Sequence, residues 1–442
     1  MSLTTRPLTR RALLKRGAAA TFAVPAVMRA HTSAAPSETV YHASFGASGM
    51  AGADIGSLTA SPYTKLVAVA DVDLRNLAQI KKRFPDVKVY QDWRELLDKE
   101  KHLNSVNVST PDHMHAPITM RAMQQGLHVY TQKPLTQTIY EARQLTRVAR
   151  EKKLITQMGI QIHSHEIHRT IVATIQAGTI GKVKEVHSWS GKHWGDKRPR
   201  PTRVDAVPKD LDWNLWLGVA SERPFLSHYY HPGEWRKRLD FGTGTFGDMG
   251  CHILDPVFTS LALTAPNSIR SAGGAPNGDN WGLDSQVRYV FPQTKHTTQT
   301  LTLFWYDGNQ RPPAEIKSLL GKRELSDQGS IYIGEQGVLY APYIDPPVLL
   351  PADKFKDVKL PNPGGNDHYL QFIEACRGNG TTSTPFDYSG PLTESVLLGC
   401  LATRFPQTTL EWDAAELKVT NVSEANAFVR RRYRKGWEVT GL

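Results

Sequence analysis

The sequence predicts an α/β protein in which a doubly wound parallel sheet precedes an α+β domain with a large, mostly antiparallel open sheet. Three patterns support this fold class. The apolar run 39–45 leads into a glycine-rich turn and then a helical segment. Apolar strands and helical segments then alternate as far as about residue 160, which is typical of a parallel sheet. Beyond that point apolar and polar residues alternate with a period of two, which is typical of an antiparallel sheet with one open face.

In the first half, short runs of branched and small apolar residues predict strands, and apolar residues three or four apart predict helices. Gly126 ends one of these helices and precedes a further strand. The expected strands are 39–45, 66–70, 87–90, 105–109 and 127–130, with helices after the turn 46–52 and at 74–83 and 116–125.

The second half begins with a helix over 166–176 that ends at Gly178, followed by an alternating strand over 183–191. A region rich in Trp, Pro and Tyr is expected to form loops over 194–235. The later expected elements are strands at 285–291, 298–304 and 330–333, loops at 312–327 and 361–367, and helices at 368–377 and 390–404.

The first 35 residues have the composition of an export signal. Thr9-Arg10-Arg11-Ala12-Leu13-Leu14-Lys15 is a twin-arginine pattern, and an uncharged, weakly apolar run over 17–28 follows it. Small residues at 32–35 offer a cleavage site. The run is too short to span a bilayer comfortably, and no later segment predicts a membrane span. We therefore predict export by the twin-arginine route to the periplasm; the alternative is the disordered basic N-terminus of a cytoplasmic protein.

Charge and cysteine content argue against a nucleic-acid-binding protein and against a protein stabilised by disulfide bonds. The formal net charge is +11, but six positive residues precede residue 35, where there is no acid, which leaves +5 for the remainder. No dense basic stripe with interleaved aromatic residues follows, so we expect no nucleic-acid partner. Cys251, Cys376 and Cys400 are too few for a disulfide framework, which is consistent with folding before export. Because such a route usually serves proteins that first acquire a cofactor, the signal also suggests a tightly held one.

The turn Gly46-Ala47-Ser48-Gly49-Met50-Ala51-Gly52 lies between a strand and a helix, which is the context of a dinucleotide-binding Rossmann fingerprint. Ser48 stands where the strict pattern has its second glycine, and Gly49 beside it can relieve the crowding of the pyrophosphate. Ala51 stands at the third position, where alanine is a common substitute. The turn therefore predicts a cofactor site with one unusual residue.

Asp71, at the end of the next predicted strand, is placed to accept hydrogen bonds from the adenosine ribose. A carboxylate there would repel a 2′-phosphate, so NAD is favoured over NADP. Arg75 nearby keeps NADP open, and the alternative for Asp71 is an ordinary surface acid.

Three later side chains have the chemistry of an acid–base site. Asp248 and His252 lie four residues apart in a helical run and therefore share one face. A carboxylate beside an imidazole can set its tautomer and raise its basicity, as a general base requires. Lys133 precedes Pro134 at the carboxyl end of a predicted strand, where it can hydrogen-bond a substrate hydroxyl. Each also has an ordinary alternative: a solvated or capping Asp/His pair, and a solvated lysine before a turn.

Four longer motifs are specific when taken together. They are Val108-Ser109-Thr110-Pro111-Asp112-His113-Met114-His115-Ala116-Pro117, Gly126-Leu127-His128-Val129-Tyr130-Thr131-Gln132-Lys133-Pro134-Leu135, Leu417-Lys418-Val419-Thr420-Asn421 and Tyr433-Arg434-Lys435-Gly436-Trp437. With the Asp248/His252 pair, they resemble the motifs of the Gfo/Idh/MocA oxidoreductases, the relatives of glucose–fructose oxidoreductase and inositol dehydrogenase. The resemblance spans nearly the whole chain after the signal. One departure is Gln132, where these proteins usually have Glu before Lys-Pro.

The resemblance implies that Lys133, Asp248 and His252 are the catalytic residues. His252 would take a hydroxyl proton while hydride leaves the same carbon for the nicotinamide, Asp248 would orient substrate and histidine, and Lys133 would stabilise the alkoxide. Thr110, Pro111 and His115 match positions on the nicotinamide side. The predicted cofactor-binding residues are Gly46, Ser48, Gly49, Met50, Ala51, Asp71, Thr110, Pro111, His115 and Gln132.

Further candidates for substrate contacts lie in the second half: Gln161, His163, Trp194, Tyr230, His231 and Trp235. The tryptophans could stack on sugar rings, although most tryptophans of the region are expected in the core. His113, His115, His163, His165 and His168 have no recognised zinc spacing, so we predict no metal site.

These observations predict an exported, NAD-dependent oxidoreductase that acts on a secondary alcohol of a sugar, glycoside or cyclic polyol. We expect a signal segment at 1–35, a dinucleotide-binding domain at 36–160, and a substrate-binding and oligomerisation domain at 161–442. An open sheet face in the second domain predicts a homo-oligomer, a dimer or tetramer.

Two other functions stay open. One is a redox-neutral glycosidase that oxidises a ring hydroxyl, eliminates the leaving group and returns the hydride, with Tyr230 or His231 as an extra base. The other is a sugar-binding protein without catalysis, which the presence of all three candidate catalytic residues argues against.

Overall fold

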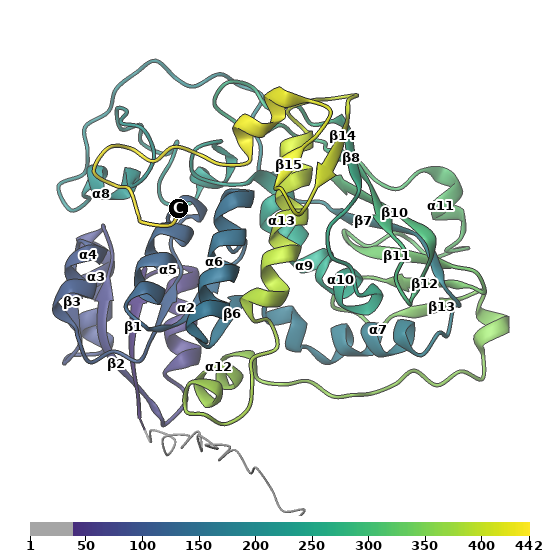
Figure 1. Ribbon diagram of the computed structural model, residues 1–442, viewed down its shortest axis with the longest axis horizontal. Coiled ribbons are helices and arrows are strands. Elements are labelled where there is room, and N and C mark those ends of the chain that lie inside the picture. Colours follow the sequence, from purple (N-terminus) through teal and green to yellow (C-terminus); the bar gives the residue numbers. More distant parts are fainter. Residues whose placement is uncertain (1–38) are drawn as a thin grey trace, which may run out of the picture. The chain divides into compact units, whose positions relative to one another are not determined.

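The computed structural model describes residues 39–442, so the predicted twin-arginine signal and its cleavage site lie outside the described residues (Figure 1). No helix within 39–442 combines the length and the apolar character that crossing a bilayer requires.

The first domain is built on a six-stranded sheet in which every neighbouring pair is parallel, in the order β3-β2-β1-β4-β5-β6. Its strands are β1 (Val40–Phe45), β2 (Thr64–Ala70), β3 (Lys88–Tyr90), β4 (Ser105–Val108), β5 (His128–Gln132) and β6 (Thr156–Gly159). The strand order reverses direction at β1, and ligands of doubly wound sheets bind beyond the carboxyl ends of the strands at such a point.

Helices cover both faces of this sheet, which confirms the doubly wound fold. They are α2 (Met50–Leu58), α3 (Leu74–Arg83), α4 (Trp93–Lys99), α5 (His115–Gln124) and α6 (Ile139–Lys152). Val69 of β2 belongs to an apolar cluster with side chains of α2 and α3, whereas Ala68 and Ala70 belong to a different cluster, which includes side chains of α4, α5 and α6. Alternate residues of one strand therefore serve the two faces, because successive side chains of a strand point in opposite directions.

The predicted helix 74–83 coincides with α3, while α4, α6 and β6 were not among the predicted elements. Local signals mark both missed helices. The Asp92 side chain accepts a hydrogen bond from the Arg94 N–H at the start of α4. Thr138 and Glu141 form a reciprocal capping box at the start of α6.

The second domain is built on a nine-stranded sheet in the order β13-β12-β11-β7-β10-β9-β8-β14-β15. Only the β7–β10 pair is parallel, so the prediction of a mostly antiparallel sheet is confirmed. The strands are β7 (Val183–Ser190), β8 (Ser268–Gly273), β9 (Gln286–Pro292), β10 (Thr297–Asp307), β11 (Gln328–Gly334), β12 (Val338–Ala341), β13 (Val348–Leu350), β14 (Thr409–Asp413) and β15 (Lys418–Val419).

Two segments expected as loops contain short helices. The region 194–235 includes α8 (Trp213–Leu217), and the region 312–327 includes α11 (Ala314–Ser318). Ile316 of α11 and Leu320 pack on Trp189, Tyr306 and other apolar side chains of the sheet. Part of the sheet face that was expected to be open is therefore covered by the chain itself.

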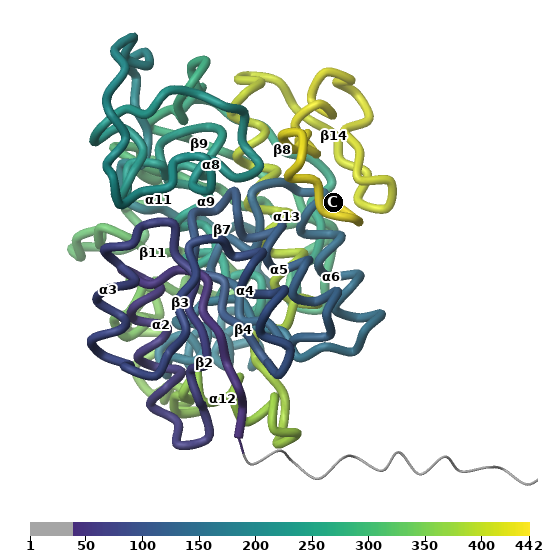
Figure 2. The backbone as a smooth tube through the Cα atoms, turned by 90° about the vertical axis from the view of Figure 1, so that its left-hand side faces the viewer, coloured from purple at the N-terminus to yellow at the C-terminus, as the bar shows by residue number. Residues whose placement is uncertain are grey.

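The other helices of this domain are α7 (Glu166–Gln176), α9 (Gly244–Ile253), α10 (Asp255–Leu261), α12 (His368–Cys376) and α13 (Phe386–Ala402). Helix α13 packs against both α6 and α9 and so joins the two domains (Figure 1). Arg143 of α6 donates two hydrogen bonds of 2.8 Å to the carboxylate of Glu394 on α13. The C-terminal end of the chain returns to the first domain beside α5 (Figures 1 and 2), where Gln124 donates to the carbonyl of Thr440.

A close approach of α13 to the sheet depends on Gly399. A Cβ atom at this position would lie 2.0 Å from the Tyr289 hydroxyl and 2.1 Å from a ring carbon of Phe246, whose ring stacks on Trp305. We expect G399A to lower the free energy of unfolding by about 1–3 kcal/mol, the usual cost of overpacking. Urea denaturation measures this change.

The matched control is G52A in α2, where the nearest atom to an added Cβ is 3.4 Å away. It should leave stability unchanged or raise it by up to about 1 kcal/mol, because alanine is the better helix former. Equal effects of the two substitutions would contradict the packing argument.

Candidate active site

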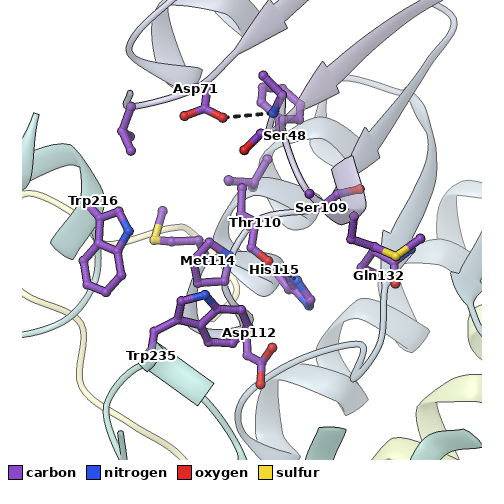
Figure 3. A pocket seen from close by; sticks show the side chains of 18 of the residues that line it. Ser48, Asp71, Ser109, Thr110, Asp112, Met114, His115, Gln132, Trp216 and Trp235 are labelled. Carbon is purple, nitrogen blue, oxygen red and sulfur yellow. Dashed lines mark hydrogen bonds between the residues drawn. The ribbon is translucent and has the colours of Figure 1, made fainter. Parts of the chain in front are cut away.

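A cavity of about 420 Å³ lies at the carboxyl end of the parallel sheet. The first domain contributes the turn 46–50, Asp71, residues 109–112 and Lys133, and the second domain contributes Trp216, His231, Trp235, Arg236 and Asp248. Figure 3 shows Trp216 and Trp235 of the second domain together with Ser48, Asp71 and Thr110 of the first. The volume is in the range of cofactor and small-molecule sites. Both domains therefore line one cavity, at the place where ligands of doubly wound sheets bind.

The glycine-rich turn leaves backbone free to approach a ligand. Gly46 has a φ of +102°, and a Cβ there would lie 2.8 Å from the Ser109 carbonyl oxygen. Helix α2 starts after Gly49 (φ +57°) with no side-chain cap and no acid in its first turn. The positive end of this helix thus faces the cavity without a competing carboxylate, as a pyrophosphate site requires. Ser48 is exposed and lines the cavity, so it does not fill the cradle.

Asp71 is held at the cavity by two backbone N–H groups, those of Ala47 and Asp73, each at 2.9 Å (Figure 3). Burial raises the pKa of Asp71 to about 6, although these N–H donors favour its charged form. Arg75 donates to the Asp73 carboxylate rather than to Asp71. Arg75, the residue that could have bound the 2′-phosphate of NADP, is therefore already paired with Asp73, which favours NAD over NADP.

The nicotinamide-side candidates line the same cavity. Thr110 has a buried hydroxyl with no hydrogen-bond partner in residues 39–442, so it is available to a bound molecule. The two ring nitrogens of His115 lie 2.7 and 2.8 Å from the carbonyl oxygens of Pro134 and Thr110. His115 therefore connects the loop that carries Lys133 to the loop that carries Thr110.

Gln132 lies against a carboxylate that the sequence analysis missed. Its amide donates to both oxygens of Asp54, at 3.0 and 2.9 Å, and Ser109 and Tyr369 donate to the same group. Burial raises the pKa of Asp54 to about 6. A glutamate at 132 would place two carboxylates in contact, so the amide fits this site. An acid on the otherwise apolar face of α2 (Ala51, Ile55, Leu58) was the signal available in the sequence.

Lys133 and Asp248 form an ion pair between the two domains. The Lys133 ammonium donates to the Asp248 carboxylate at 2.6 Å and to its backbone carbonyl at 3.0 Å. Arg236 lies 3.6 Å from the same carboxylate and packs on the Trp235 ring. Burial by itself would raise the pKa of Asp248, but Lys133 and Arg236 outweigh it and lower the pKa. Arg236 was not among the predicted site residues.

His252 follows Asp248 on α9, yet the expected contact between them does not form. No hydrogen bond joins the two side chains in the described residues, because the carboxylate is directed to Lys133. The Nδ1 atom of His252 is buried without a partner. Burial, and then the charge of Lys133, lowers the pKa of His252 to about 3. Its ring is therefore neutral, and it lines a second, much smaller cavity with His168 and Tyr343 rather than the main one.

The structure separates the remaining substrate candidates into two sets. Trp235 and His231 line the cavity, with His231 Nε2 lying 3.3 Å from an Asp73 oxygen. Tyr230 is buried among Trp213, Trp216 and Phe241 and does not line it.

Three others also lie outside its lining. Trp194 is half-buried, with its backbone N–H donating to Thr245. Gln161 donates to the hydroxyls of Tyr130 and Tyr369, and His163 contacts Asp255. Aromatic and polar composition could not separate these side chains from the two that line the cavity.

Asp112 is another missed acid, and it lines the cavity between the two domains. Its carboxylate accepts a 2.7 Å hydrogen bond from the Thr243 hydroxyl. Burial raises the pKa of Asp112 to about 7, even though Arg236 and Lys133 nearby favour its charged form. The Pro-Asp-His run within the resemblance motif was the available signal.

Comparison with known proteins agrees with this geometry. Residues 43–160 match the Gfo/Idh/MocA oxidoreductase family, NAD-binding Rossmann fold, and residues 165–292 match its C-terminal alpha/beta domain. The chain belongs to the Gfo/Idh/MocA oxidoreductase family. The resemblance inferred from the motifs is thus confirmed, and the first domain is an NAD-binding Rossmann domain.

Curated relatives match over part of their length. The chain is 22% identical over 196 residues to levoglucosan dehydrogenase of Pseudarthrobacter phenanthrenivorans, which covers 44% of this chain and 42% of that protein. It is 25% identical over 177 residues to the NADP(+)-dependent scyllo-inositol 2-dehydrogenase of Bacillus subtilis, which covers 40% of each. The matched region therefore spans about two fifths of these relatives.

Solved structures share the fold over most of the chain. The WlbA dehydrogenase of Bordetella pertussis, solved with NADH and UDP-GlcNAcA, aligns with a TM-score of 0.62 at 13% identity, over 85% of this chain and 98% of that one. The aldose-aldose oxidoreductase of Caulobacter crescentus aligns with a TM-score of 0.57 at 13% identity, over 85% and 100%.

The Asp54–Gln132 contact predicts strong coupling between two substitutions. Q132E sets a second carboxylate against Asp54, and D54N replaces one of the two oxygens that accept from the Gln132 amide with an NH2 donor, so each alone should cost about 1–3 kcal/mol. The double variant D54N/Q132E restores one amide and one carboxylate, and we expect it to recover most of the loss in a urea double-mutant cycle. Additive losses would contradict the assignment.

Asp112 predicts a pH-dependent difference in stability. With a folded pKa of about 7 and an unfolded pKa near 3.9, the native chain keeps a proton that the unfolded chain releases between pH 4 and 7. Wild-type protein therefore loses stability over this window relative to D112N, whose amide does not titrate. When the pH is raised from 5 to 8, the free energy of unfolding of D112N, measured with urea, should increase by about 1 kcal/mol or more relative to that of wild type. A constant difference would mean that Asp112 is ionised in the native state at both pH values.

Proposed function

We propose that this protein is an exported oxidoreductase that transfers hydride between a secondary alcohol of a sugar, glycoside or cyclic polyol and a tightly bound NAD. The observation that carries the proposal is the shared cavity. Its first-domain side has the glycine turn, the uncapped start of α2 and Asp71, and its second-domain side has Asp248 opposite Lys133.

The residues of the cavity fit NAD. The turn and the start of α2 suit the pyrophosphate, Asp71 suits the adenosine ribose, and the free Thr110 hydroxyl lies on the side expected for the nicotinamide. When bound, the cofactor would supply the hydride acceptor.

The Lys133–Asp248 pair is suited to hold a substrate hydroxyl. The ammonium can donate to the substrate oxygen and stabilise the negative charge that develops on it, while the carboxylate accepts from a neighbouring hydroxyl. His252, the predicted proton acceptor, is neutral and has no partner for its Nδ1, but it lines the smaller cavity and its pKa is lowered to about 3. The geometry therefore favours Lys133 and Asp248 over His252 for direct contact with a substrate hydroxyl in the main cavity. Arg236 adds a second cation that keeps Asp248 ionised.

Export makes a tightly bound cofactor necessary, because the periplasm holds no free pool to regenerate it. Either a second substrate reoxidises the cofactor or one substrate is oxidised and later reduced. The sugar dehydrogenases among the matched proteins support a carbohydrate or polyol substrate.

The decisive experiment denatures protein purified after export and assays the supernatant for NAD(H) and NADP(H). We expect about one equivalent of NAD per chain, and turnover of sugars or glycosides without added cofactor. A product that carries a keto group would support net oxidation. Cleavage of a glycoside with neither net oxidation nor net reduction would assign a redox-neutral glycosidase instead. A protein that binds neither dinucleotide would overturn the proposal.

Substitution of Lys133 tests the site itself. K133M removes the donor to the substrate oxygen, so we expect turnover to fall at least about 10²-fold while the bound NAD is retained. K152M, at an exposed position on α6, is the control and should keep wild-type turnover. Undiminished activity of K133M with a full complement of NAD would place the chemistry elsewhere.

A further inference from the structure

A second cluster of reactive side chains lies beside the candidate active site. His163 is in the short 3-10 segment Gln161–Ser164, His168 is in α7, and Asp255 begins α10. These elements are brought together because α7 packs against α10. The proposed function assigns no role to this cluster, although His163 alone was predicted to contact substrate.

The three side chains are arranged around one carboxylate. His163 Nδ1 lies 3.0 Å from one oxygen of Asp255, and His168 Nδ1 lies 3.3 Å from the other. One ligand atom from each residue lies within 4.8 Å of the other two. A metal bound at 2.0–2.2 Å to imidazole nitrogen and carboxylate oxygen holds its ligand atoms about 3.0–3.5 Å apart. The two separations from imidazole nitrogen to carboxylate oxygen already lie in this range, and the two imidazoles, whose ligand atoms lie within 4.8 Å of each other, would move closer together around an ion.

His168 supplies the second observation that points to a ligand. Its side chain is only 2% exposed, and neither ring nitrogen has a hydrogen-bond partner in residues 39–442. Leaving a buried polar group unpaired costs about 1–3 kcal/mol. A proton shared between His163 and Asp255 would explain that pair, but it leaves His168 Nε2 without a partner and His168 Nδ1 with only the 3.3 Å contact to Asp255, which is not a hydrogen bond.

The groups around Asp255 and His163 resemble those found around metal ions in metalloproteins. Asp255 is fully buried, and the Tyr388 hydroxyl donates to one of its oxygens, as outer partners of metal-binding carboxylates do. The side chain of His163 keeps 14% exposure, which leaves a route for an ion to enter.

We propose that His163, His168 and Asp255 form a binding site for a divalent first-row transition-metal ion, with two imidazoles and one carboxylate as its protein ligands. This donor set suits Zn²⁺ and Fe²⁺ and leaves coordination positions open. The site lies next to His252, because Asp255 is three residues further along the chain and His168 and His252 line the same small cavity. The sequence predicted no metal because these ligands come from three separate elements without a recognised spacing.

The test measures metal binding directly and does not depend on turnover. Protein stripped with EDTA is titrated with ZnCl₂ in a calorimeter, and its metal content is determined by mass spectrometry after dialysis. Substitution with Co²⁺ adds a visible absorption band that reports the geometry of the ligands. We expect one tightly bound Zn²⁺ per chain and a Co²⁺ band typical of four or five ligands.

Variants assign the site. H168Q and H163Q should each weaken Zn²⁺ binding at least tenfold, and Zn²⁺ should raise the Tm of wild type but not of H168Q. H187Q is the matched control, because His187 is a buried histidine in β7 that pairs with Glu185 instead. It should bind Zn²⁺ as wild type does.

Two results would overturn the metal site: wild type without a stoichiometric Zn²⁺ and without the Co²⁺ band, or H168Q that binds Zn²⁺ as tightly as wild type. Because NAD content is assayed separately, a protein that carries NAD but binds no metal would overturn this inference and leave the proposed function standing.

Discussion

The ion pair between Lys133 and Asp248 is the contact on which the rest of the site depends. Lys133 follows the last residue of β5 in the Rossmann sheet, and Asp248 lies on α9 of the second domain, so the pair closes the cavity across the two domains. Both side chains are largely shielded from water, with 16% and 14% of their surfaces exposed. Removing one partner would leave a shielded charge unpaired, which is far more costly than losing an exposed pair. Helix α13 packs against α6 of the first domain and α9 of the second, and so holds the two domains in the arrangement that brings Lys133 and Asp248 together.

The same pair explains the state of the groups around it. Asp248 stays ionised because two cations outweigh its burial, and the charge of Lys133 helps to keep His252 neutral. Asp112 and Asp54 receive less compensation, and burial raises the pKa of both carboxyl groups. One cavity therefore holds a carboxyl group with a lowered pKa, Asp248, and one with a raised pKa, Asp112. Enzymes use such pairs to separate the proton donor from the proton acceptor.

Much of the fold was predictable because its signals are local. Helix α3 and helix α7 have the predicted bounds, since regular apolar spacing and clear ends mark both. Prediction was poorer where a strand or helix owes its existence to its neighbours. Strand β6 is four residues long and entirely buried, and α11 is a five-residue helix held by apolar contacts to the second sheet. Short elements carry little periodicity, so packing decides them.

The sequence by itself determined the family and the NAD-binding domain, and it predicted Lys133, Asp248 and His252 as catalytic residues, because motifs of fixed spacing lie within single elements. Only the tertiary structure decided which partners these residues have. It directs Asp248 to Lys133 instead of His252, and it sets Gln132 against Asp54. Contacts between residues far apart in the chain depend on how helices and sheets pack, and no local pattern of residues records that packing.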